Sequence, residues 1–476
     1  MKNTAIAKQV RVRFAPSPTG NLHVGGLRTA LFNWLFAKNH GGVFLIRVED
    51  TDRERSKTEY MQSQLASLQW TGIESDEPIL IQSERSQVYQ EVIETLFAHN
   101  KVYRCFCSPE AIEARVRTAG ITGDHYRYDG YCRDKNHATS SESFVVRVAV
   151  PQSIENITFK DVIRGNVTFE KDQLDDFIIV RSDGSPTYNF TVVVDDAYSR
   201  ISHIIRGEDH ISNTPKQILL YQACGYPVPE FAHIPMILGP EGNRLSKRDG
   251  AVDVLSYRQE GYLPDALVNY MIRLGWSHGD QEIFTRQEMI KYFSLSHVGK
   301  KAAIFDYTKL EWVNGVYMQA AQTQDLLHIL ISSVDHDFYA KVQQWSNKEV
   351  LKAIEMYKER VKTLKMLAQV ITQLYDGPSE YQQEAIKTWM TSIAYGLLDK
   401  LIMLLEDVPF TQEDLKEITN AFCKQHAIKL VTIAQPVRIA LTGSITSPGI
   451  FELLTLLGKH ESLKRLKAFQ RFLENR

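Results

Sequence analysis

Residues 10–46 read VRVRFAPSPTGNLHVGGLRTALFNWLFAKNHGGVFLI and alternate the signals of strand and helix. Val10–Phe14 alternates apolar and polar residues, as a strand does, and the prolines at 16 and 18 then force a loop because neither can continue a sheet ladder. Gly41 and Gly42 end the helix that follows, and Val43–Ile46 is an apolar run typical of a buried parallel strand. Within Gly25–Lys38 the apolar residues recur at the spacing of one helix face: Leu27, Ala30, Leu31, Trp34 and Leu35.

Strand, loop, helix and strand in this order predict a βαβ unit of a parallel, nucleotide-binding sheet. Two later changes of pattern divide the rest of the chain. Phe144–Val150, Ile163–Phe169 and Phe177–Val194 predict β-hairpins, with a turn at residues 183–186, and strand and helix signals resume near Ile201. This middle part therefore indicates an insertion between two halves of the first domain.

From about Leu326 the pattern is helical throughout, and Leu351–Leu374 is one such stretch. The last predicted helix carries Leu463, Leu466, Phe469, Phe472 and Leu473 on one face, with Lys464, Arg465, Lys467 and Arg471 elsewhere. The predicted fold is an α/β Rossmann-type catalytic domain with an α+β insertion, followed by an all-α C-terminal region. The expected divisions are 1–104 and 196–255 for the two Rossmann halves, 105–195 for the insertion, 256–325 for a connecting region and 326–476 for the helices.

The composition is that of an ordinary globular protein. Of 476 residues, 43% are hydrophobic and 24% charged, which excludes a disordered, collagen-like or disulfide-scaffold chain. The formal net charge of −2 argues against coating nucleic acid through bulk charge, but it leaves room for a local basic face. Five cysteines form no disulfide framework, and no apolar run approaches the ~20 residues of a membrane span. With no apolar signal core at the start, we expect a cytoplasmic protein away from membranes.

The loop at Pro16–Gly26 lies where the first strand meets the first helix, the position at which α/β sheets bind ligands. Helix N-termini favour phosphate, so His23 would face a phosphate there, and Gly25 and Gly26 would let a base or ribose approach the backbone. A histidine in a loop is more often merely solvated, so this motif is weak evidence by itself.

A second motif, Arg244-Leu245-Ser246-Lys247-Arg248, lies in a glycine-rich loop. Its three cations could close over a triphosphate and neutralise charge on the α-phosphate and on the leaving pyrophosphate. Taken alone, the loop would more simply be an exposed basic turn.

Together the two motifs resemble the paired "HIGH" and "KMSKS" elements of class I aminoacyl-tRNA synthetases, and the resemblance extends over essentially the whole chain. The string from Arg13 to Asn33 is similar to the glutamyl-tRNA synthetase family in particular. So are Tyr188-Asn189-Phe190, Val194-Asp195-Asp196, Ile205–His210, His233–Met236, Ala434–Arg438 and Ala440–Gly443. Two residues depart from the general motifs: Gly26 replaces the second histidine, a change common in this subfamily, and Arg244 replaces the usual leading lysine.

The resemblance implies a glutamate–tRNA ligase that activates L-glutamate with ATP and Mg²⁺ and transfers it to tRNA(Glu), with a monomer as the family default. It implies catalytic roles for His23 and Lys247. The ATP site would comprise His23, Gly25, Gly26, Asp209, Ser246 and Lys247. Residues 105–195 would bind the acceptor end of the tRNA, 256–325 its stem, and 326–476 its anticodon.

Selectivity for glutamate requires cations for its carboxylates and an anion for its ammonium group. Arg13, Glu49 and Arg206 each end a predicted strand, so all three reach the same sheet edge; the alternative for each arginine is a surface salt bridge. By resemblance Arg13, Tyr188 and Arg206 hold the side-chain carboxylate, and Ala15, Ser17 and Glu49 complete the glutamate site.

Cys105, Cys107 and Cys132 could present thiolates to a structural zinc ion, and some relatives carry zinc here. Tyr128 matches the fourth ligand of one arrangement, whereas Asp134 stands at the histidine position of the other. Reduced structural thiols without a metal are the alternative.

In the helical region Arg360 matches a position linked to reading the last anticodon base and rejecting glutamine tRNA. Arg438 and Thr442 match positions that contact the first base. For Arg360 the alternative is a solvated helix charge.

Three other functions fit part of the sequence. A glutaminyl-tRNA synthetase shares the catalytic core, but its anticodon region is a β-barrel. A small-molecule nucleotidyltransferase could use the two motifs but has little use for a helical third. A tRNA-binding regulator with an inactive core would not need His23, Lys247 and the arginines.

Overall fold

The computed structural model describes residues 9–52, 54–118, 127–135, 142–243, 245 and 253–475. The chain forms two compact units. The first comprises Met1–Ser256 and Leu267–Tyr307, and the second comprises Tyr257–Ala266 and Thr308–Arg476. None of the helices in the described ranges is long and apolar enough to cross a membrane.

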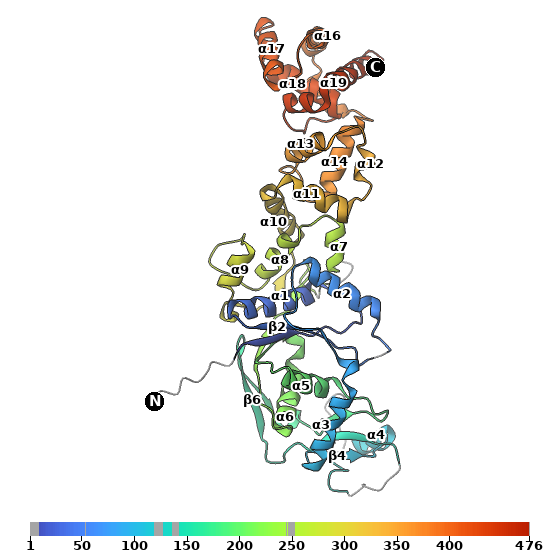
Figure 1. Cartoon of the computed structure of the whole chain (residues 1–476), viewed down its shortest axis with the longest axis vertical. Coiled ribbons are helices and arrows are strands. Elements are labelled where there is room, and N and C mark those ends of the chain that lie inside the picture. The colour runs from blue at the N-terminus through green and yellow to red at the C-terminus, as the bar shows by residue number, and fades with distance from the viewer. Residues whose placement is uncertain are drawn as a thin grey trace, which may run out of the picture. The chain divides into compact units, whose positions relative to one another are not determined.

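The first unit begins with the predicted βαβ arrangement, which is confirmed. Strands β1 (Arg11–Phe14) and β2 (Val43–Val48) are parallel and joined through helix α1 (Val24–Asn39), which packs on both of them (Figure 1). β3 (Leu80–Ile81) continues the sheet beyond β2, also in parallel. The carboxyl ends of these strands therefore meet at one edge, which is the edge where Arg13 and Glu49 were predicted to lie.

Helix α1 is buried on more sides than its periodicity predicts. Besides the predicted apolar face, Arg28, Phe32, Asn33 and Phe36 are buried as well. The Phe32 ring lies 5.2 Å from that of Phe293, which follows helix α9 (Arg286–Tyr292), so a second layer covers the face of α1 opposite the sheet. The helix that carries the His23 loop at its N-terminus is thus fixed from both sides.

A second, mixed sheet has the order β7 (Gly165–Glu170), β6 (Asn156–Asp161), β10 (Glu230–Ile234), β9 (His203–Gly207). β9 and β6 both run parallel to β10, and β6 and β7 form an antiparallel hairpin. β9 lies beside β1, because the Ser202 amide donates a hydrogen bond of 2.9 Å to the Arg11 carbonyl. The strand order thus runs outward from β1 in one direction and from β9 in the other, so the crevice at their carboxyl ends is a topological switch point.

A third sheet, antiparallel, comprises β4 (Val102–Cys105), β5 (Val145–Val148) and β8 (Ile178–Val180). The prediction that Phe177–Val194 forms a hairpin is wrong beyond the turn. After β8 and the turn at residues 183–186, the chain enters helix α5 (Tyr188–Tyr198). Four residues at i, i+3, i+4 and i+7 pack into the core from one face of α5: Phe190, Val193, Val194 and Ala197. Burial of that face outweighs the strand preference of the valine run.

The other elements of the first unit include helices α2 (Thr58–Trp70), α3 (Ser86–Ala98), α4 (Pro109–Thr118) and α6 (Thr214–Ala223), and the short strands β11 (Ile237–Leu238) and β12 (Ala303–Ile304). Helices α7 (Val254–Gln259) and α8 (Pro264–Arg273) each contribute residues to both units.

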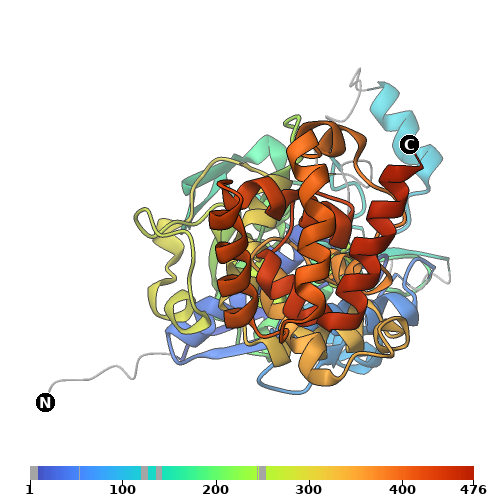
Figure 2. The same ribbon diagram turned by 90° about the horizontal axis from the view of Figure 1, so that it is seen from above.

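The second unit is helical throughout its described residues, as predicted. Its helices α16, α18 and α19 pack side by side (Figures 1 and 2). The helices are α10 (Tyr307–Ala320), α11 (Thr323–Ile329), α12 (Phe338–Lys341), α13 (Asn347–Tyr357), α14 (Leu364–Asp376), α15 (Gln383–Trp389), α16 (Ser392–Glu406), α17 (Gln412–Gln425), α18 (Leu430–Thr442) and α19 (Ile450–Glu474).

Two details of the helical region differ from the sequence pattern. The stretch 351–374 is two helices, α13 and α14, because the turn between them is held from outside: the Leu364 amide donates to the Gly261 carbonyl, and the Asn314 amide group to the Lys362 carbonyl. Arg465, predicted off the apolar face, is 4% exposed and donates to the carbonyls of Leu374, Tyr375 and Leu441.

Candidate active site

Arg13, at the carboxyl end of β1, is buried and fixed by an acid that the sequence analysis did not assign. Its Nε and Nη2 donate to the two carboxylate oxygens of Asp196, at 2.9 and 3.3 Å. Asp196 is 1% exposed and comes from α5, which covers this face of the sheet. The bidentate bond sets the plane of the Arg13 guanidinium.

Arg47 completes this buried charge cluster. It lies on β2 two residues before Glu49, so both side chains share one face of the strand. Its Nη1 lies 2.5 Å from the same Asp196 oxygen that Arg13 Nε reaches, and its Nη2 donates to Glu49 at 3.0 Å. Burial raises the pKa of the Glu49 carboxyl despite the attraction of Arg47 and Arg13. For Asp196 the two arginines outweigh burial and lower its pKa.

Arg206, at the end of β9, is also buried, but among the described residues it contacts only neutral hydrogen-bond acceptors. Its Nη1 donates to Gln217 Oε1 at 2.8 Å and its Nη2 to Thr214 Oγ1 at 2.8 Å, both on α6. Its Nε donates to Nε2 of His233 on β10 at 3.2 Å. Burial without a paired carboxylate lowers the pKa of Arg206, because the charged form loses water without gaining an anion.

Tyr188, the first residue of α5, joins these arginines. Its hydroxyl lies 3.2 Å from Nδ1 of His210. Burial, followed by the charge of Glu49, raises the pKa of Tyr188 to about 12, and Arg206 and Arg13 act in the opposite direction. The structure therefore brings four of the predicted glutamate residues into one electrostatic cluster: Arg13, Glu49, Tyr188 and Arg206.

The other two predicted glutamate residues, Ala15 and Ser17, lie in the loop after β1, where Ala15 is partly buried and Ser17 exposed. The buried Gln64 of α2 holds this loop by donating to the carbonyls of Ser17 at 3.1 Å and Gly20 at 2.7 Å. The backbone at the mouth of the crevice is thus fixed by a residue that the sequence analysis missed.

His23 is the N-cap of α1. Its Nδ1 accepts a 3.1 Å hydrogen bond from the amide of Gly26, as the side chain of an N-cap residue does. A Cβ added at Gly26 would come within 2.8 Å of Leu22, and one at Gly25 within 3.0 Å of the His23 ring. Both glycines therefore keep the turn compact. Asp209, the remaining predicted ATP residue with described structure, is exposed directly after β9.

The predicted catalytic Lys247 and its neighbours Ser246, Arg244 and Arg248 lie outside the described residues. The chain re-enters the described part at Asp253, which forms an antiparallel bridge with His23. Asp253 also accepts a 3.0 Å hydrogen bond from Asn21. The first described residue after the basic motif, Asp253, is therefore held beside the His23 turn.

The three predicted zinc cysteines meet in the insertion. The sulfurs of Cys105, Cys107 and Cys132 all lie within 4.8 Å of one another. The Tyr128 hydroxyl is 3.2 Å from the Cys105 sulfur and 3.4 Å from that of Cys107. Asp134, the alternative fourth ligand, is exposed and is not part of this cluster.

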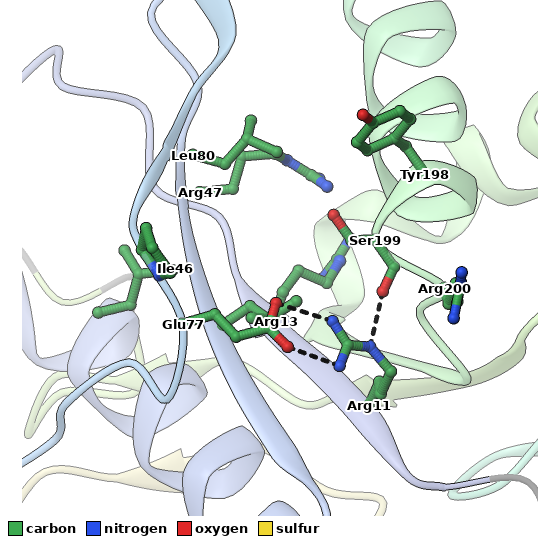
Figure 3. A pocket seen from close by; sticks show the side chains of 11 residues that line it. Arg11, Arg13, Ile46, Arg47, Glu77, Leu80, Tyr198, Ser199 and Arg200 are labelled. Atoms are coloured by element: carbon green, nitrogen blue, oxygen red, sulfur yellow. Dashed lines mark hydrogen bonds and ion pairs between the residues drawn. The ribbon is translucent and has the colours of Figure 1, made fainter.

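A separate pocket of about 360 Å³ lies on the Arg13 side of the sheet (Figure 3). Its lining includes Arg11, whose guanidinium donates to both oxygens of Glu77 and to the Ser199 carbonyl. Arg13 and Arg47 also line it, whereas Tyr188 and Arg206 do not. The pocket therefore shares Arg13 with the cluster of predicted glutamate residues, but the other members of that cluster do not line it.

The predicted anticodon residues lie in the second unit. Arg438 of α18 donates to the Ile445 carbonyl at 3.2 Å, and the Thr442 hydroxyl donates to the Arg438 carbonyl at 2.9 Å. Arg360 is exposed in the turn after α13 rather than within a helix. Burial lowers the pKa of Arg438, and the positive charge of Arg360 lowers it further.

Comparisons with known proteins show the family to which the chain belongs. Residues 9–312 match the family described as tRNA synthetases class I (E and Q), catalytic domain, and residues 337–470 match an anticodon binding domain. The chain is 46% identical over 463 residues to a glutamate–tRNA ligase of Thermodesulfovibrio yellowstonii, covering 96% of this chain and 98% of that one. It is 45% identical over 467 residues to one of Geobacter sulfurreducens, covering 98% and 99%. The chain belongs to the glutamate–tRNA ligase family.

Solved structures of this family have the same fold. The crystal structure of a glutamate tRNA ligase from Elizabethkingia meningosepticum, in complex with its amino acid, aligns with a TM-score of 0.87 at 32% identity and covers 98% of this chain and all of that one. The catalytic-domain match contains every residue predicted for ATP and glutamate, and the anticodon match contains Arg360, Arg438 and Thr442. The helical second unit also rules against the glutaminyl alternative, which predicts a β-barrel.

Proposed function

We propose that the chain joins L-glutamate to tRNA(Glu) at the crevice between the ends of β1 and β9, using ATP. The observation that carries this proposal is Arg206, a buried cation with neutral described partners beside Arg13 and Tyr188. Such a site favours a ligand that brings its own carboxylate, and glutamate has one on its side chain. Glutamine, lacking that charge, would leave Arg206 buried without an anion.

In the first step the α-carboxylate of glutamate attacks the α-phosphate of ATP, and pyrophosphate leaves. The residues of the chain position the two substrates and stabilise developing charge, and no protein nucleophile is needed. His23 would serve the phosphates at the N-terminus of α1, and Lys247 would act from the loop that rejoins the chain at Asp253. Mg²⁺, bound with ATP, would neutralise phosphate charge. The first step thus forms glutamyl-adenylate. In the second step the 2′-hydroxyl of the terminal adenosine attacks the glutamyl carbonyl of this adenylate, forming the ester, and AMP leaves.

Parallel charging reactions test this function. Purified tRNA(Glu) and tRNA(Gln) would each be incubated with the protein, ATP and labelled glutamate, and with labelled glutamine as the control amino acid. We expect glutamate to be attached to tRNA(Glu) and glutamine to neither tRNA. Failure to charge tRNA(Glu), or attachment of glutamine, would overturn the proposal.

The cysteine cluster supports a structural zinc ion held by Cys105, Cys107, Cys132 and Tyr128. Tetrahedral zinc with Zn–S bonds of about 2.3 Å places its ligand atoms roughly 3.5–4 Å apart. The Cys107 sulfur already lies 3.4 Å from the Tyr128 oxygen and 3.5 Å from the Cys132 sulfur. Zinc would hold the insertion together away from the chemistry.

Metal analysis of untagged, chelator-washed protein tests this site. We expect about one zinc per chain in the wild type and in Asp134→Asn, and a clear loss in Cys132→Ser and Tyr128→Phe. Absence of zinc from the wild type would contradict the site. If Asp134→Asn lost zinc and Tyr128→Phe kept it, the fourth ligand would be Asp134 instead of Tyr128.

A further inference from the structure

His233 and Asp161 form a buried pair directly behind Arg206. His233 is 0% and Asp161 1% exposed, and the two come from neighbouring strands, β10 and β6. In the β9–β10 ladder, His233 is the register partner of Arg206. The three side chains therefore form a line across three adjacent strands that ends in the crevice.

The hydrogen bonds along this line fix where the imidazole proton lies. Asp161 Oδ2 is 2.6 Å from His233 Nδ1, and an ionised carboxylate can only accept, so Nδ1 carries the hydrogen. Nε2 then has a lone pair and accepts from Arg206 Nε at 3.2 Å. The pKa of Asp161 lies below its usual value. Burial alone would raise it, but the hydrogen bonds that Asp161 accepts from His233 and from two backbone amides outweigh burial. Burial lowers the pKa of His233, which keeps the imidazole neutral.

The same arrangement determines what Arg206 can offer. Its five N–H groups comprise one on Nε and two on each terminal nitrogen. His233 takes the Nε hydrogen, Gln217 takes one hydrogen on Nη1, and Thr214 and the His210 carbonyl take the two on Nη2. Among the described residues this leaves one Nη1 hydrogen available, and the guanidinium is held in a fixed plane by acceptors that leave its charge uncompensated.

We propose that His233 and Asp161 are positioning residues for glutamate: the carboxylate of Asp161 fixes the proton on the imidazole, and the imidazole orients Arg206 while leaving its charge available to the substrate. A carboxylate placed directly against Arg206 would orient it equally well but would cancel the charge that selects an amino acid with a side-chain carboxylate. This inference rests on the proposed function, because it assumes that Arg206 meets the side-chain carboxylate of glutamate.

A purely structural role for the pair is the competing explanation. Asp161 also accepts hydrogen bonds from the amides of Ile163 and Arg164 and thereby stabilises the β6–β7 turn. Substitution of Asp161 would therefore affect folding and function together. His233 separates the two roles, because glutamine can keep an acceptor near the Nε2 position whereas phenylalanine fills the space without one.

The experiment measures steady-state tRNA charging by wild type, His233→Gln, His233→Phe and the control His203→Gln. His203 lies on the same β9–β10 ladder, opposite Glu230, three residues from Arg206. Loss of a hydrogen bond to a charged group predicts a rise in the KM for glutamate of about 10- to 100-fold in His233→Phe. We expect a change of less than about threefold in His233→Gln and His203→Gln, and an unchanged KM for ATP in all of them.

Circular dichroism verifies that each variant is folded, and His233→Leu replaces the phenylalanine variant if that one is not. Equal KM values for glutamate in the glutamine and apolar variants would overturn the inference, as would a parallel rise in the KM for ATP. Failure of the wild type and of His203→Gln to charge tRNA(Glu) would instead refute the proposed function.

Discussion

Arg13 and Arg206 end neighbouring strands, but only Arg13 is paired with a carboxylate of the protein. Arg13 shares Asp196 with Arg47, so its charge is largely compensated within the protein. Among the described residues Arg206 donates only to neutral partners, so no carboxylate is paired with its charge. We therefore expect charge selection to rest on Arg206, and Arg13 to contribute a rigid guanidinium fork.

The fork of Arg13 leads to the first prediction. Lysine keeps the charge but cannot make the two parallel bonds to Asp196, so Arg13→Lys should lower kcat/KM for glutamate by about 100-fold or more. Charging kinetics measure the effect, with Arg11→Lys as the control, because Arg11 lies two residues earlier on β1 and pairs with the exposed Glu77. Near-normal turnover in Arg13→Lys would remove this arginine from the site.

Asp196 leads to a prediction about stability and pH. Replacing it with Asn leaves Arg13 and Arg47 buried without their shared anion, which should lower the free energy of unfolding by about 3–5 kcal/mol at neutral pH. Because the folded pKa of Asp196 lies below its unfolded value of about 3.9, its contribution is present above that pH and is lost as pH falls further.

Urea unfolding of the wild type and Asp196→Asn at pH 7 and at about pH 3 measures both effects. The difference between the two proteins should shrink at the lower pH. Glu77→Gln, which breaks an exposed pair, is the control and should change stability by less than about 1 kcal/mol. If Asp196→Asn lowered the free energy of unfolding by less than about 1 kcal/mol, Asp196 would not be the shared anion of Arg13 and Arg47.

At this scale the sequence located the ends of the strands but not the partners of the side chains there. Arg13, Glu49 and Arg206 are predictable because strands that are parallel bring their carboxyl ends to one edge. Asp196 is not, because it lies 183 residues further along the chain, in helix α5, whose residues up to Val194 were predicted as part of a hairpin. The single usable signal for Arg47 was its place two residues before Glu49 on one strand face.

Helix α19 contains a kink that depends on one residue. Gly458 has φ 74° and ψ 171°, a conformation open essentially to glycine alone, and the helix continues on both sides of it. Gly458→Ala should therefore destabilise the protein by about 1–3 kcal/mol. Gly396, inside α16 with open space around its Cα, is the matched control, and Gly396→Ala should stabilise by about 0.5–1 kcal/mol. Thermal unfolding measures the stability of both variants. Equal changes in stability in Gly458→Ala and Gly396→Ala would show that the kink does not require glycine at position 458.

Elements were predicted well where one periodic pattern decided the outcome and poorly where distant contacts did. β1, α1 and β2 follow from their own residues. Helix α5 was missed because its three consecutive valines favour strand, whereas burial of one face decides for helix. The break between α13 and α14 has no glycine or proline to signal it, since Gly261 and Asn314 hold the turn through hydrogen bonds.

For the whole molecule, the placement of charge matters more than its total. A net charge of −2 gives no sign of an RNA partner. In the second unit, however, the positive charge of Arg360 adds to burial in lowering the pKa of Arg438, and an anionic ligand would offset such repulsion. We expect this unit to carry the anticodon contacts and the first unit the chemistry.

Arg360→Gln tests this division of roles. We expect the KM for tRNA(Glu) to rise about tenfold with the KM for glutamate unchanged, and charging of tRNA(Gln) with glutamate to increase. Lys387→Gln, which removes an exposed lysine paired with Glu384 in the same unit, should leave both KM values unchanged. A rise in the KM for glutamate in Arg360→Gln would show that the residue does not act through tRNA alone.

The parallel pairing of β6 with β10 has a consequence for how this protein can be rearranged. β6 belongs to the stretch that resembles a self-contained insertion, yet it completes the catalytic sheet and supplies Asp161 behind Arg206. The stretch 105–195 is therefore not an interchangeable module. A chimera that grafts only the part before β6 keeps the crevice intact, whereas one that replaces the whole stretch must also inherit Asp161 in the same register. Variation among relatives should accumulate in the first part and be constrained in the second.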